Sequence, residues 1–388
     1  MPLTIALPSA SGAVETYQMG PPARFPARSV PFNRQALAAL HVVPDISGAY
    51  DPWQGGALDW DATLSLRHRI WDLGLGVAEA MDTAQRGMGL AVADAMELNR
   101  RSILEARARK DQPVLFCGVG TDALADGPQS LDAILSAYEA QMEAVERDGG
   151  RVVLMASRAL AAAAQGPEDY ARVYDRLLAG AAAPVIIHWL GEMFDPALQG
   201  YWGHADHYGA MDVVLDLLSR HALKTAGVKL SLLDADKEIA LRARLPDGVR
   251  MFTGDDFNYV SLIEGADGAT SDALLGAFDM AAPAASAALG RLAAGDIPGW
   301  RAILQPTEAL ARHVFAAPTR YYKTGVVFLA WLYGWQRSPL MLGGQESARS
   351  ILHLAECFRL ADRAGLFADP DRAASRMETV LAVHGIGS

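Results

Sequence analysis

The sequence predicts an α/β protein built on a parallel sheet, and three observations support that prediction. Short apolar runs typical of buried strands alternate with amphipathic, helix-like stretches through the first two thirds of the chain. Eight such runs can be counted, the number that a closed (β/α)8 barrel needs. The 388 residues are 51% hydrophobic and 20% charged, which supplies enough apolar surface for a large core.

Each predicted strand is a short apolar run that is followed by Gly or by polar residues. In chain order the predicted strands are 38–43, 76–80, 114–117, 151–155, 185–189, 225–230, 249–252 and 268–271. The stretches between them carry apolar residues at three- and four-residue spacing, which is the period of a helix with one buried face. They predict helices at 61–73, 92–107, 131–147, 167–178 and 211–221.

No further strand is expected after residue 271, because the rest of the chain has only helical periodicity. The predicted helices are 273–294, 306–315, 321–333, 347–364 and 371–383. The sequence therefore divides into three parts. Residues 1–33, rich in Pro, Gly and Ala, are expected to form an irregular arm, 34–295 the barrel, and 296–388 a helical bundle packed on the barrel.

Charge and cysteine content narrow the class of partner. The net charge of −11 argues against binding to nucleic acid or to anionic membranes, so we expect a small-molecule partner. Cys117 and Cys357 are far apart and lie in apolar segments, as expected for reduced core thiols. The first residues lack a signal-peptide pattern and no apolar run is long enough to span a bilayer, so we expect a cytoplasmic protein.

Lys229 is the most informative residue, because it lies near the end of a predicted buried strand. Side chains alternate along a strand, so Gly227, Lys229 and Ser231 share one face while Val228 and Leu230 face the other way. An amine placed in such a confined space loses solvation, which lowers its pKa and exposes a nucleophile. The alternative interpretation is a surface lysine at the end of a strand.

Polar residues follow several predicted strands, and in such barrels the active site lies at those carboxyl ends. Four turns contribute them: 79–87 after the second strand, 118–122 after the third, 188–192 after the fifth and 254–256 after the seventh. The sequence thus predicts a polar rim at one end of the barrel.

The same segments carry a resemblance to a known family. Five segments, taken in order, resemble the dihydrodipicolinate synthase and N-acetylneuraminate lyase superfamily, and the resemblance covers roughly residues 42–315. The segments are Gly118-Val119-Gly120-Thr121, Pro184-Val185-Ile186-Ile187-His188, Gly227-Val228-Lys229, Gly254-Asp255-Asp256 and 265–271. The chain looks like an outlying branch of that superfamily. The resemblance implies a (β/α)8 barrel, commonly in homodimers or homotetramers, whose lysine forms a Schiff base with a 2-oxo acid. Lys229 matches that lysine.

Departures from the family pattern bear on the substrate. Members usually have a tyrosine proton shuttle where this chain has His188, and a hydroxyl-rich turn that holds the substrate carboxylate where it has Met81-Asp82-Thr83-Ala84-Gln85. Asp82 at about 4 Å from a substrate carboxylate would cost roughly 4 kcal/mol at an effective dielectric constant of 20, unless Arg86 offsets it. An acidic rim suits a neutral, polyhydroxylated substrate; its predicted members are Glu79, Asp82, Glu192, Asp255 and Asp256.

These observations predict a lyase or hydro-lyase of the class I aldolase type that acts, without a cofactor, on a 2-oxo acid or a sugar-derived keto compound. Lys229 would form the imine and His188 would move the proton, although His188 is equally compatible with a packed core histidine. The remaining predicted contacts are to substrate. Thr83 and Thr121 would orient it, with Asp82 beside them; Asp255, Asp256 and Ser271 would bind its distal hydroxyls, unless Asp255 and Ser271 instead cap helices.

Two other functions remain open. A metal-dependent sugar isomerase would use His188, His204 and His207 with carboxylates of the rim, although the preferred interpretation contains no metal. A non-catalytic sugar-binding barrel would retain the fold without turnover.

Overall fold

Eight parallel strands form a closed barrel in the computed structural model, which describes residues 3–26, 30–48, 51–52, 56–266 and 268–386. In the closed order each strand pairs with its neighbours along the chain, and the last strand pairs with the first. The strands are β3 (Ala36–Ala39), β4 (Gly76–Glu79), β5 (Leu115–Val119), β6 (Arg151–Leu154), β7 (Val185–Leu190), β8 (Thr225–Ser231), β9 (Arg250–Thr253) and β10 (Asp272–Leu275). The predicted (β/α)8 fold is confirmed.

The barrel interior is filled by apolar side chains that neighbouring strands contribute. Phe116, Val153, Ile186 and Phe252 form the centre of this cluster, and all four are fully buried. Because side chains alternate along a strand, the residue two positions beyond each of these also points into the barrel.

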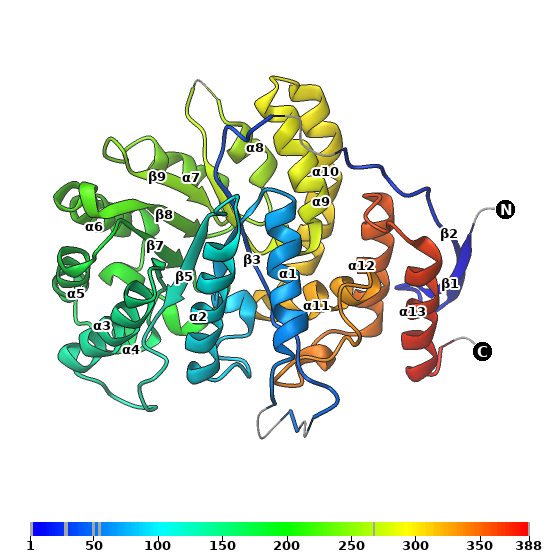
Figure 1. Ribbon diagram of the computed structural model, residues 1–388, viewed down its shortest axis with the longest axis horizontal. Coiled ribbons are helices and arrows are strands. Elements are labelled where there is room, and N and C mark those ends of the chain that lie inside the picture. Colours follow the sequence, from blue (N-terminus) through cyan, green and yellow to red (C-terminus); the bar gives the residue numbers. More distant parts are fainter. Residues whose placement is uncertain (1–2, 27–29, 49–50, 53–55, 267, 387–388) are drawn as a thin grey trace. The chain divides into compact units, whose positions relative to one another are not determined.

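The chain divides into two compact units. One contains the whole barrel, in residues 34–40 and 74–276, and the other contains residues 1–33, 41–73 and 277–388. In the barrel unit the larger helices lie around the outside of the strands (Figure 1). They are α2 (Val92–Ala108), α3 (Leu131–Arg147), α4 (Arg158–Ala163), α5 (Pro167–Gly180), α6 (His207–Arg220), α7 (Ala235–Arg242) and α8 (Tyr259–Glu264).

The second unit is mainly helical. It holds α1 (Trp60–Asp72), α9 (Ala277–Ala293), α10 (Ile297–Val314), α11 (Tyr322–Leu332), α12 (Ile351–Arg363) and α13 (Pro370–Val383). Residues 1–33, predicted to be irregular, include an antiparallel pair, β1 (Thr4–Pro8) and β2 (Val14–Gln18), joined by a turn at Gly12. That expectation was wrong for these two segments. The boundary predicted at residue 295 between barrel and bundle stays a prediction.

Two strand predictions need correction. The eighth strand is Asp272–Leu275 and not 268–271, because Ala269, ahead of it, is bridged to Ala266 and not to a strand of the barrel. The first strand is Ala36–Ala39 and not 38–43. Both errors arise because a short apolar run that continues into other buried residues gives no sharp boundary.

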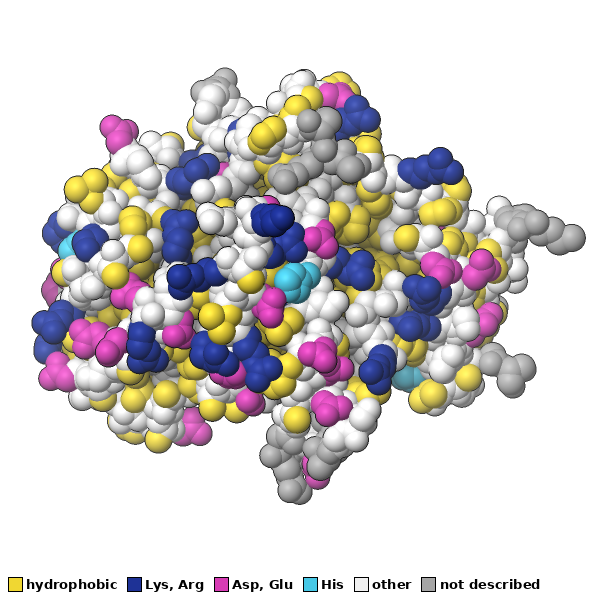
Figure 2. All heavy atoms as spheres, viewed as in Figure 1, with side chains coloured by type: hydrophobic (Ala, Val, Ile, Leu, Met, Phe, Trp, Pro, Cys, Tyr) yellow, Lys and Arg dark blue, Asp and Glu magenta, His cyan; other side chains and the backbone are white. Residues whose placement is uncertain are grey.

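The surface carries charges of both signs. On the face shown in Figure 2, basic and acidic side chains lie next to one another over the described residues. No helix in the described part of the chain is both long and apolar enough to cross a membrane.

Candidate active site

Lys229 points into the barrel. It pairs with Phe252 on β9, and residues opposite each other on neighbouring strands face the same side of a sheet. Phe252 belongs to the interior cluster, so the lysine lies on the interior face as the alternation predicted. Its side chain is only 5% exposed.

Burial has the largest effect on the pKa of the Lys229 amine. Loss of solvation lowers the pKa of Lys229, while the carboxylates of Asp82 and Asp256 raise it and so oppose the shift. The net direction is downward, which increases the fraction of neutral, nucleophilic amine at a given pH. Asp82 and Asp256 come from different loops, after β4 and after β9, yet both act on this one group.

His188 lies beside the lysine. It pairs with Lys229 in the register of β7 and β8, and it lies two residues beyond the interior residue Ile186. Its Nε2 is 3.1 Å from Ser231 Oγ, so the imidazole is held by a hydroxyl from the same strand as the lysine. Burial and the charge of Lys229 hold the pKa of His188 well below its usual value, with Asp82 opposing them. At neutral pH the ring is therefore uncharged.

Gly254, which has no side chain, leaves room for the side chain of Lys229. A Cβ at this position would lie 3.0 Å from Lys229 Cε and 2.8 Å from the carbonyl oxygen of Leu230, and it would collide with Ser231 Oγ. Such contacts are too short for any side chain to be accommodated without displacing its neighbours. Sequence reasoning noted Gly254 only as part of a motif and missed this steric role.

Asp82 and Thr83 lie in a short 3-10 turn, Asp82–Ala84, directly after β4. Asp82 is partly exposed whereas Thr83 is buried. The carboxylate of Asp82 acts on both Lys229 and His188, so the structure brings these three predicted residues together with Asp256.

Arg86 is not available to a substrate carboxylate. Its Nε and one terminal nitrogen each donate to Asp122 at 2.7 Å. The other terminal nitrogen donates to the carbonyl oxygens of Ala80 and Gly118, and a further bond goes to Gln141. All five N–H donors of a guanidinium are thereby used. The arginine instead fixes the loops after β4 and β5 to each other.

Asp255 and Ser271 are engaged by other protein groups. Asp255 accepts hydrogen bonds from the backbone N–H groups of Phe257 and Asn258, at 2.8 and 3.1 Å, in the turn before α8; it does not cap that helix, whose N-cap residue is Asn258. Ser271 lies before β10, at the opposite end of that strand from the one predicted, and donates to Glu238 at 2.7 Å. We therefore leave both out of the proposed substrate site.

Thr121 follows β5, and its Oγ1 is 2.6 Å from Ser157 Oγ. The backbone N–H of Ser157 in turn donates to the hydroxyl of Tyr201 at 3.0 Å. Thr121 is thus part of a hydroxyl chain that the sequence did not predict, because Ser157 and Tyr201 lie 36 and 80 residues further along.

The predicted acidic rim is smaller than expected. Glu79 lies on β4 one residue beyond the inward-facing Ala78, so it points outward and accepts a hydrogen bond from Ser102 on α2 at 2.5 Å. Glu192 instead pairs with His207, 3.2 Å away. Of the five predicted carboxylates, Asp82 and Asp256 are those that act on the lysine.

The histidines predicted as metal ligands do not form a cluster among the residues that the structure describes. In the described part of the chain, His188, His204 and His207 form no group of three ligand atoms close enough to share an ion. His207 contacts Trp189 and Glu192, whereas His188 bonds to Ser231. The structure therefore gives no support to the predicted metal-dependent isomerase.

One family model covers almost the whole chain. Residues 5–386 match the model of a family described as "Protein of unknown function (DUF993)". A search of curated proteins found no match.

Solved structures with the same fold are dihydrodipicolinate synthases and relatives. YagE from Escherichia coli K12, a prophage protein of the dihydrodipicolinic acid synthase family in complex with pyruvate, aligns with a TM-score of 0.63 at 12% identity, over 92% of this chain and 99% of that one. Dihydrodipicolinate synthase from Aquifex aeolicus gives 0.59 at 12% identity, over 91% and 98%. The Acinetobacter baumannii enzyme with pyruvate gives 0.59 at 16% identity, over 86% and 99%. The predicted resemblance is confirmed at the level of the fold.

Proposed function

Because the chain belongs to the family described as "Protein of unknown function (DUF993)" and has the fold of the dihydrodipicolinate synthases, we propose that it is a class I aldolase-type lyase or hydro-lyase. Lys229 is its Schiff-base residue. The observation that supports this most is a buried amine on the interior face of the barrel, with a lowered pKa and two carboxylates acting on it.

The first step would be attack of the neutral Lys229 Nζ on a ketone carbon, which forms a C–N bond while one proton moves from the nitrogen to the carbonyl oxygen and a second proton is taken up from solvent. Loss of that oxygen as water leaves a protonated imine. The positive charge that was on the ammonium form is now fixed on the imine nitrogen, where Asp82 and Asp256 stabilise it. The same two carboxylates that oppose the fall of the lysine pKa thus favour the intermediate.

The second step would break a bond beside the imine. In C–C cleavage a base takes the proton of the β-hydroxyl, the bonding electrons flow into the iminium to give a neutral enamine, and an aldehyde departs. In dehydration a base takes the α proton to give the enamine, which then expels the β-hydroxyl. The base returns its proton to that hydroxyl, so that water departs and an α,β-unsaturated iminium remains. We assign the role of the base to His188. Burial lowers the pKa of His188 most, and the positive charge of Lys229 lowers it further. When the iminium charge collapses, that influence disappears and the imidazole becomes a better proton acceptor. Ser231 Oγ, 3.1 Å from His188 Nε2, would carry the proton.

The charges around the amine favour a substrate without a carboxylate next to its ketone. Asp82 and Asp256 are anionic neighbours, and Arg86 is fully engaged with Asp122, Gln141 and backbone carbonyls. We therefore propose a sugar-derived keto compound over a small 2-oxo acid, since carboxylates accept hydrogen bonds from hydroxyls. Thr83 and Thr121 would orient its chain.

Reductive trapping separates the substrate classes. The protein would be incubated with ketoses, with pyruvate and with longer 2-oxo acids in turn, and each mixture reduced with borohydride and analysed by intact mass. An adduct with a ketose but weaker labelling by pyruvate is expected. Labelling by 2-oxo acids alone would retain the mechanism and overturn the substrate class. A folded protein that gives no adduct would favour the non-catalytic binding barrel.

A further inference from the structure

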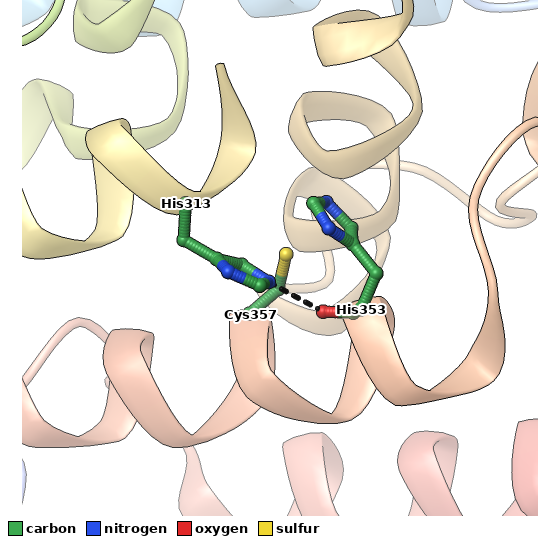
Figure 3. A group of neighbouring side chains, drawn as sticks. All are labelled: His313, His353 and Cys357. Carbon is green, nitrogen blue, oxygen red and sulfur yellow. Dashed lines mark hydrogen bonds between the residues drawn. The ribbon is translucent and has the colours of Figure 1, made fainter. Parts of the chain in front are cut away.

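The helical unit contains a cluster of metal-ligand residues that the proposed lyase chemistry does not use. His313 lies in the last turn of α10, and His353 and Cys357 lie four residues apart on α12. One ligand atom from each residue falls within 4.8 Å of the other two. Figure 3 shows the three side chains converging, with the sulfur of Cys357 between the imidazole rings in this view.

The spacing on α12 explains why two of the three side chains meet. Residues four apart project from the same face of a helix, so His353 and Cys357 lie one turn apart. Helix α10 packs against α12 and brings His313 to that face, where the two imidazole rings stack with their centroids 4.1 Å apart. The cluster therefore results from packing between helices and not from a flexible loop.

The hydrogen bonds of the cluster leave lone pairs for an ion. His313 Nε2 donates to the backbone carbonyl oxygen of His353 at 3.0 Å, a bond that orients the ring and does not involve Nδ1. Metal-bound histidines are commonly oriented by such a bond from the other ring nitrogen. His353 Nε2 is buried and has no hydrogen-bond partner among the described residues. A buried polar atom without a partner is costly unless something binds it.

The Cys357 thiol would lose its proton on binding a metal, as metal thiolates do.

We propose that His313, His353 and Cys357 bind a thiolate-preferring transition-metal ion, best matched by Zn²⁺, which fastens α10 to α12. Two imidazoles and one thiolate are the ligands that zinc prefers, and three protein ligands leave a fourth position for water. Metal bonds of about 2.0–2.3 Å require the ligand atoms to approach one another by roughly 1 Å. This site is independent of Lys229, so its failure would leave the lyase proposal untouched.

Cobalt titration tests the site directly, because a thiolate bound to Co²⁺ gives a near-ultraviolet charge-transfer band. The full-length protein would be stripped with a chelator and titrated with Co²⁺, and Zn²⁺ would then be added in competition. We expect the band to saturate at one ion per chain and to disappear when Zn²⁺ displaces Co²⁺.

The two cysteines of the chain provide a matched control. Cys357→Ala is expected to abolish the band, whereas Cys117→Ala, which removes the other buried thiol, is expected to retain it. His353→Gln is expected to weaken binding by about tenfold or more, and it serves as the second variant if Cys357→Ala does not fold. Absence of the band from the wild-type protein, or a band that survives both Cys357→Ala and His353→Gln, would overturn the proposal.

Discussion

Lys229 and His188 lie opposite each other on the neighbouring strands β8 and β7, and both point into the barrel. Each is almost completely buried, and the charge of the lysine lowers the pKa of the histidine. The two groups therefore do not titrate independently. A change in the charge of the amine, such as formation and collapse of an iminium, changes the basicity of the imidazole beside it.

Gly254→Ala is expected to abolish imine formation. The added methyl group would press on the Leu230 carbonyl oxygen and on Lys229 Cε, at 2.8 and 3.0 Å, so the amine must move. Overpacking of this kind costs about 1–3 kcal/mol of folding free energy. Adduct yield after borohydride reduction and the thermal midpoint would be measured together.

Gly180→Ala is the control for this substitution, because a Cβ at Gly180 meets nothing within 4 Å. It should leave adduct yield unchanged. If Gly254→Ala formed adduct at the wild-type rate, the close approach of Gly254 to the lysine would have no functional consequence.

Asp82→Asn is expected to shift the pH dependence of imine formation to lower pH. Imine formation requires neutral amine, so the rate rises as pH passes through the pKa of Lys229. The carboxylate of Asp82 raises that pKa, and its removal lowers it further. Initial rates of adduct formation across a pH series would reveal the shift, with Asp236→Asn on the exposed side of α7 as the control. A shift toward higher pH would contradict the electrostatic assignment.

The same variant should accept 2-oxo acids better than the wild type does. A carboxylate at about 4 Å from Asp82 would meet a repulsion of up to roughly 4 kcal/mol, and the amide of Asn removes it. The ratio of pyruvate adduct to ketose adduct should therefore rise by about tenfold or more, which corresponds to roughly 1.4 kcal/mol. An unchanged ratio would show that Asp82 does not face the substrate.

Glu238 should make the folded protein less stable as pH rises. Burial raises the pKa of this carboxyl from 4.5 to about 8, so the folded state keeps a proton that the unfolded state has lost. Its contribution to stability is fully present below pH 4.5 and is lost as pH approaches 8, by at most about 5 kcal/mol. Glu238→Gln should flatten this slope and raise stability near pH 8. Glu143→Gln, at an exposed position on α3, should not.

Much of the fold followed from the sequence because strand and helix periods are local properties. Alternation on β8 predicted that Lys229 shares a face with Gly227 and Ser231, and the pairing with Phe252 identifies that face as the interior one. The same rule, applied to β4, would have placed Glu79 outside the barrel once Ala78 was known to face inward. The sequence alone did not reveal which of the two faces was the interior one.

Other parts of the site depend on contacts between distant segments. The pairing of Arg86 with Asp122 joins two loops 36 residues apart, and it decides that the arginine cannot bind substrate. Which of the adjacent residues Asp255 and Asp256 acts on Lys229 depends on the loop conformation and not on any period. The position of β10 was obscured by the apolar run into α9.

The most direct test of the account is the site of borohydride trapping, located by peptide mass spectrometry after incubation with a keto-sugar. The chain has five lysines, and Lys323 in the helical unit is as buried as Lys229, so Lys229→Met and Lys323→Met form a matched pair. A ligand-sized mass gain is expected on the peptide bearing Lys229, lost in Lys229→Met and retained in Lys323→Met. Labelling that persists in folded Lys229→Met protein would contradict it.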